Sequence, residues 1–71
     1  MTVKFIETIE GFFKNSYKEL GVKEMTILPE KGDVIQRNGN RWRVGMKRFM
    51  FDTDEGDYVL VFMIPIDRKK E

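Results

Sequence analysis

Two runs of the chain, residues 41–51 and 58–66, are rich in β-branched and aromatic side chains. An acidic segment with turn-forming residues, 52–57, separates them. Such side chains are enriched in strands, and two runs of this kind around a short turn are typical of a β-hairpin. The rest of the chain therefore has to pair with this hairpin or cover one of its faces.

The register of the hairpin follows from its turn, because side chains alternate between the two faces of a strand. A turn over residues 53–56 places Phe51 opposite Tyr58 and Phe49 opposite Leu60. These pairs would form one continuous apolar face, since directly opposed residues share a side of the sheet.

Continued without interruption, this register would turn Trp42 and Val44 to the other face. One extra residue on the strand at 41–51 turns Trp42 and Val44 back to the first apolar face. We therefore predict a β-bulge at Lys47 or Arg48. The expected inner face then consists of Trp42, Val44, Met46, Phe49, Phe51, Tyr58, Leu60, Phe62, Ile64 and Ile66.

The opposite, outer face of the hairpin combines arginines with apolar residues. A solvated face normally carries polar side chains at nearly every position, so exposed apolar positions beside cations favour an interface. The alternative is a sheet that curls enough to bury its apolar members against its own first strand, as small barrels do. The predicted partner-binding residues are Arg41, Arg43, Arg48, Met50, Val59, Val61 and Met63.

The N-terminal region shows a helical period. Thr2 can cap a helix over residues 3–20, and Gly21 can supply the left-handed residue that ends it. A helix with one apolar stripe would cover the sheet. The stripe consists of Phe5, Ile6, Ile9, Phe12, Phe13, Tyr17 and Leu20.

Two shorter strands precede the hairpin. Pro29 should end the first of them, and the pair Asn38-Gly39 predicts a two-residue type I′ turn that sets Ile35 opposite Trp42. The expected fold is a single α+β domain with one N-terminal amphipathic helix packed on a twisted four-stranded antiparallel meander. Its elements are a helix at 3–20, strands at about 24–28, 33–37, 41–51 and 58–66, and a frayed basic tail at 68–71.

Residues 31–44 read Lys-Gly-Asp-Val-Ile-Gln-Arg-Asn-Gly-Asn-Arg-Trp-Arg-Val. A Gly-Asp pair begins one strand of this run, and an Asn-Gly turn begins the next. The run resembles the opening strands of SH3-like barrels of the KOW and Tudor kind. The resemblance implies that the meander curls into an SH3-like partial barrel; the N-terminal helix is not part of that pattern.

Composition excludes several kinds of chemistry. The 71 residues include no cysteine and no histidine, which removes disulfides, thiolates and the commonest metal ligand and general base. The acidic segment 52–57 does not have the ligand spacing of a calcium loop. We therefore expect no enzyme, no metal and no cofactor. The chain has no membrane-spanning apolar run and no secretory signal, which favours a cytoplasmic protein.

The expected function is binding. We expect a small protein–protein interaction module, a regulator or inhibitor similar in character to phage-encoded effectors, which contacts a larger protein or a second copy through the outer face. The net charge of +1 and the acidic hairpin tip favour a protein partner over phosphates. The alternative is a nucleic-acid-binding SH3-like domain that uses the basic patch Arg37, Arg41, Arg43, Lys47 and Arg48.

Overall fold

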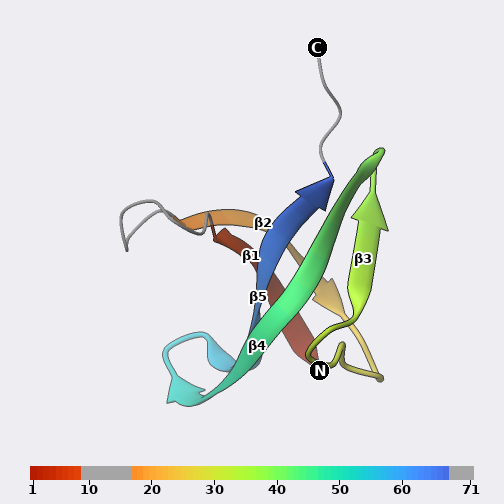
Figure 1. The fold of residues 1–71 in the computed structure, drawn as a ribbon. Coiled ribbons are helices and arrows are strands. Elements are labelled where there is room, and N and C mark those ends of the chain that lie inside the picture. Colours follow the sequence, from red (N-terminus) through yellow and green to blue (C-terminus); the bar gives the residue numbers. More distant parts are fainter. Residues whose placement is uncertain (9–16, 68–71) are drawn as a thin grey trace.

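The computed structural model describes residues 1–8 and 17–67, and this part of the chain forms one curled β-sheet without any helix (Figure 1). The order across the sheet is β2-β1-β5-β4-β3. β1 pairs with β5 in parallel, and the other neighbours pair antiparallel. The strands are β1 (Thr2–Thr8), β2 (Tyr17–Glu24), β3 (Val34–Arg37), β4 (Asn40–Thr53) and β5 (Gly56–Asp67).

The predicted α+β class is wrong, because the N-terminal helix expected over residues 3–20 is absent from the described residues. Residues 3–8 belong to β1 and residues 17–20 belong to β2, while 9–16 lie outside the described part. Apolar residues in adjacent positions fit both a helical and an extended pattern over a short stretch. The β-branched residues of β1 favour the extended one, and β5 offers it a pairing edge.

The short hairpin β3–β4 confirms the register expected from its turn. Asn38 and Gly39 adopt positive φ angles of 54° and 82°, and Ile35 lies opposite Trp42. The strand expected at 24–28 is wrong, because β2 ends at Glu24 and the residues after it form the connection to β3. The tail at 68–71 lies outside the described residues.

The long hairpin β4–β5 closes at Thr53–Gly56 as predicted, but its register differs just before the turn. Asp52 is inserted there with a φ of 60°, so Met50 rather than Phe51 lies opposite Tyr58. The insertion moves the pairs from Met50 to Lys47 by one residue relative to the predicted register. Because side chains alternate, a shift of one residue exchanges the two faces.

A second irregularity of β4 lies at Gly45, between Val44 and Met46, and not at Lys47 or Arg48, where the bulge was expected. Met46 lies opposite Phe62, as predicted. Most of the expected inner positions are not in the core. Met46, Phe49, Phe51 and Ile66 are exposed, and Tyr58, Leu60, Phe62 and Ile64 are only partly buried.

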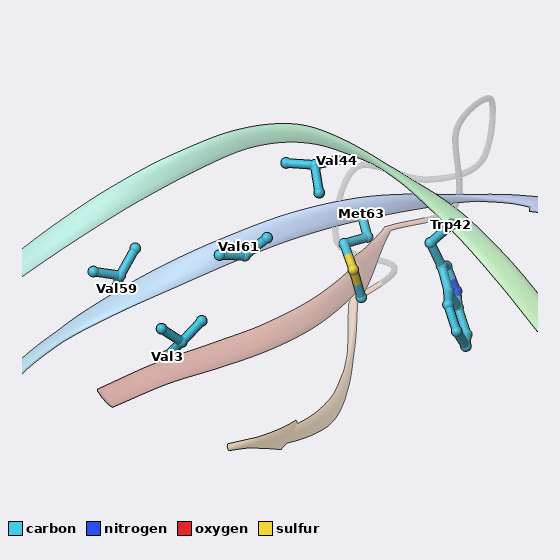
Figure 2. Packing of buried hydrophobic residues seen from close by; sticks show 6 residues of the cluster. All are labelled: Val3, Trp42, Val44, Val59, Val61 and Met63. Atoms are coloured by element: carbon cyan, nitrogen blue, oxygen red, sulfur yellow. The ribbon is translucent and has the colours of Figure 1, made fainter. Parts of the chain in front are cut away.

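The core fills the concave side of the curled sheet. Leu20 of β2 and Ile35 of β3 both pack against it, and since these strands are the two edges of the sheet, the sheet must wrap around the core. Met25 and Leu28 from the β2–β3 connection also pack on it. Figure 2 shows the buried side chains, which are Val3, Trp42, Val44, Val59, Val61 and Met63.

Candidate functional site

The central strand β5 carries apolar side chains on both faces. Val59 and Val61 are fully buried on the concave face, whereas Leu60, Phe62 and Ile64 alternate with them on the opposite, convex face. A continuous apolar run is typical of a strand that is covered on both sides. Within the described residues, strands contact only their neighbours in the sheet, and no strand crosses over the convex face. This convex face is the candidate site.

The bulge of β4 creates a hollow on the convex face. Gly45 carries no side chain, and an added Cβ would lie 3.6 Å from the backbone oxygen of Phe62, an ordinary contact distance. A side chain at position 45 would therefore fit without a clash, and its absence leaves this space open. The hollow has a volume of about 350 Å³ and is lined by Thr8, Tyr17, Gly45, Met46, Arg48, Phe62 and Ile64.

Phe62 is the centre of this hollow. The Tyr17 ring lies 6.0 Å from the Phe62 ring, tilted by 56°, and the Arg48 guanidinium carbon lies 5.5 Å from the same ring centre. Tyr17 itself is 59% exposed. Aromatic residues, Met and Arg are the residue types enriched in the centres of protein interfaces, so this combination is suited to a contact.

Lys4, Arg43 and Arg48 are cations on the convex face. Lys4 forms an ion pair with Glu55 and lies 4.1 Å from the ring centre of Tyr58. Lys4 donates a hydrogen bond to the Glu55 carboxylate, and this bond raises the pKa of Lys4 above its ordinary value. Arg43 and Arg48 are exposed, and no carboxylate of the described residues forms an ion pair with either. Two arginines on this face can therefore accept acidic partners.

The structure divides the predicted partner-binding residues between two environments. Val59, Val61 and Met63 are in the core, with exposed fractions of 0%, 0% and 1%, so their assignment to a binding surface is wrong. The sheet curls and buries them, as the alternative expected, but the first strand it expected them to pack against, at 24–28, is not formed. Arg43, Arg48 and Met50 lie on the convex face, and Arg41 is exposed near the start of β4.

Sequence reasoning missed the aromatic part of the convex face. Phe62 and Ile64 were assigned to the core, and Tyr17 was placed in a helix. The uninterrupted apolar run of β5 was a signal that both of its faces need cover. The inserted Asp52, which decides which residues lie on which face, gave no comparable signal.

The five cations of the alternative nucleic-acid site do not share one surface. Lys47 lies opposite Val61, on the concave side, and forms an ion pair with Glu30 at 3.3 Å. Arg37 donates a hydrogen bond to the backbone oxygen of Leu20 at 3.1 Å. Arg41, Arg43 and Arg48 remain exposed along β4.

The described residues contain no cluster of three or more acidic side chains that could hold a metal ion. They also contain no helix of the length and hydropathy needed to cross a membrane. Comparison with protein-family models, curated proteins and solved structures found no match to this chain.

Proposed function

We propose that the protein is a binding module that docks a larger protein on the convex face of its sheet. The observation that carries this proposal is β5: within residues 1–8 and 17–67, no other strand covers its convex apolar side chains. A module of this kind acts by occupying a surface of its partner, as a small regulator or inhibitor does. A second copy of the chain is another occupant of the same class.

The chemistry of the face defines the partner. Phe62 and Met46 offer an apolar centre, while Arg43 and Arg48 offer positive charge around it. The matching surface has an apolar patch bordered by Asp or Glu. An ordinary interface buries about 800 Å² on each partner, and the chain exposes 5480 Å² in total, so one face of the sheet provides enough area.

Two variants of the convex face test the proposal. Met46→Asp places a charge in the hollow, and Arg48→Glu reverses the charge beside it. Each should reduce the amount of partner protein that co-purifies with the tagged chain by about tenfold or more, since each disturbs the interface centre. Quantitative mass spectrometry of the bound proteins measures this loss.

Ile27→Asp is the matched control, because Ile27 is an exposed apolar residue, 80% exposed, in the β2–β3 connection. It should retain all partners that the unmodified chain retains. Equal loss in the control and the convex variants would contradict the proposal. Light scattering on the purified chain separates self-association from binding of a different protein.

Nucleic acid is the second candidate, because Arg48 lies beside the partly buried Phe62 ring, which the exposed Tyr17 ring also contacts, and Arg41 and Arg43 precede it on β4. Cations next to stacking aromatic rings are what single-stranded nucleic acid requires. Binding of a labelled oligonucleotide should then weaken steeply as salt rises. A protein complex centred on Phe62 should depend much less on salt.

A further inference from the structure

The two edge strands of the sheet face each other without pairing. β2 and β3 run antiparallel, and the connection at residues 25–33 joins one end of each (Figure 1). No Cα atom of β2 lies within 8 Å of a Cα atom of β3. Paired strands are about 4.8 Å apart, so the edges are separated by more than one pairing distance. We call the space between Leu20–Lys23 and Ile35–Arg37 the seam.

The seam is nevertheless narrow enough for one side chain to cross it. Arg37 of β3 reaches over and donates a hydrogen bond to the backbone oxygen of Leu20 on β2, at 3.1 Å. One strand inserted between two others requires two pairing distances, about 9.6 Å. This spacing is larger than the 8 Å by which the Cα atoms of β2 and β3 are at least separated, and an extended arginine can span it. The width of the seam therefore suits one additional strand.

Backbone groups on both edges point into the seam. Met1 and Met25 exchange two hydrogen bonds of 2.9 Å, and in an antiparallel pair such residues alternate with residues that face away. Val22 and Glu24 therefore direct their N–H and C=O groups towards the seam. On β3, the two-residue turn makes Arg37 and Asn40 a hydrogen-bonded pair. The N–H and C=O groups of Gln36, one residue earlier, therefore point away from β4 and towards the seam.

A groove of about 480 Å³ lies behind the seam. Its walls include Phe5, Ile35, Trp42 and Met63, so its floor is apolar. The charged residues among its lining are Lys23 and Arg37, both cations, and no carboxylate of the described residues lines it. An occupant should present apolar groups inward and at least one negative charge at the rim.

We propose that the seam binds an extended peptide segment of a partner protein as an additional strand of the sheet. The segment pairs with Val22 on one side and Gln36 on the other, antiparallel to one edge and parallel to the other. Its alternate side chains are apolar and enter the groove. An acidic side chain of the segment replaces the Leu20 oxygen as the acceptor of the Arg37 guanidinium. Strand addition of this kind derives affinity from the backbone and specificity from the pockets.

Eight-residue synthetic peptides with apolar residues at alternate positions and Asp or Glu between them are the probe. Trp42, the one tryptophan of the chain, lines the groove and reports occupancy by its fluorescence. Members of such a peptide set should change the Trp42 emission in a saturable way. Methylation of alternate backbone nitrogens in the best peptide should weaken its binding about tenfold or more, because it removes donors and leaves side chains unchanged.

A matched pair of variants locates the binding on the edge. Gln36→Pro removes an N–H that faces the seam and leaves the hydrogen bonds between β3 and β4 intact. Proline is tolerated at such positions of edge strands. It should weaken the best peptide about tenfold, whereas Gln36→Thr, which keeps the N–H, should not. On the unmodified chain, the peptide should slow amide hydrogen exchange of Val22 and Gln36, which tests the proposal without any variant.

Three outcomes would overturn the proposal: no peptide of the set binds, methylated and unmethylated peptides bind equally, or dodecanoate saturates the Trp42 signal while the peptides do not. The last outcome would identify a pocket for amphiphilic anions. The seam is independent of the convex face, so Met46→Asp should leave peptide binding unchanged. Failure of one site is thereby distinguished from failure of the other.

Discussion

Single residues of β5 decide which face of the sheet is core. Val61 is fully buried, so Val61→Asp places an unpaired carboxylate in the core. A domain of this size has a stability of only about 3–5 kcal/mol, and burial of an unpaired charge exceeds that. We expect Val61→Asp to abolish cooperative unfolding in urea, followed by circular dichroism.

Met46 is the matched position on the convex face, where it is 47% exposed. Met46→Asp should stay folded, with a free energy of unfolding within about 1 kcal/mol of the unmodified chain. A folded Val61→Asp protein combined with an unfolded Met46→Asp protein would show that the two faces of the sheet are assigned the wrong way round.

At the chain start, one carboxylate links stability to pH. Glu24 accepts a hydrogen bond from the Thr2 hydroxyl and lies 3.2 Å from the N-terminal ammonium. These partners, the hydroxyl first, lower the pKa of Glu24 below its ordinary 4.5. A carboxyl whose pKa is lower in the folded state stabilises the fold above the ordinary value, and the effect is lost as pH falls through the folded pKa.

The unmodified chain should therefore unfold at a higher urea concentration than Glu24→Gln at about pH 7, and the two midpoints should converge at about pH 2. The difference should be small and should shrink in high salt, because the pair is exposed to solvent. A gap between the midpoints that persists at about pH 2 would mean that Glu24 stabilises the strand by some means other than its charge.

The elements show where sequence reasoning is sufficient. Asn38-Gly39 belongs to the small set of residue pairs that adopt the left-handed angles of a type I′ turn, so the β3–β4 register was predictable. The pairing of β1 with β5 was not, because it joins residues from opposite ends of the chain and has no local signal. Without it, the apolar residues at 3–20 were interpreted as a helix.

At the element scale, Asp52 fixes the phase of the β4–β5 hairpin with its φ of 60°. A β-branched side chain is strained in this conformation, so Asp52→Val should lower the free energy of unfolding by about 1–2 kcal/mol or more. Asp52→Gly relieves the same strain but loses a side chain, and should remain much closer to the unmodified chain. Urea titrations of both variants measure the difference; equal stability of the two would contradict the strained backbone.

For the whole molecule, the candidate site was only partly predictable. Arg43, Arg48 and Met50 share one face of the sheet, as expected, and their role in binding a partner stays a prediction. Phe62 was not assigned to this face, because a one-residue insertion in a hairpin exchanges core and surface for every residue beyond it. A single-layer sheet with apolar residues on both sides gives no composition signal that distinguishes its two faces.

The topology also predicts how the molecule folds. The β3–β4 hairpin is local, whereas β1 reaches β5 only after nearly the whole chain is in place. We therefore expect refolding in milliseconds to seconds, with the hairpin formed in the transition state and the β1 contacts formed later. Gly39→Ala, at a φ of 82°, should mainly slow folding.

Val3→Ala, at a fully buried position of β1, should cost about 2 kcal/mol and mainly accelerate unfolding. Stopped-flow measurements in urea separate the two rates for each variant. The reverse pattern, with slower folding for Val3→Ala and faster unfolding for Gly39→Ala, would mean that the parallel pairing of β1 with β5 forms first. The convex face would then form before the short hairpin closes, and closure of that hairpin would complete the seam by adding β3.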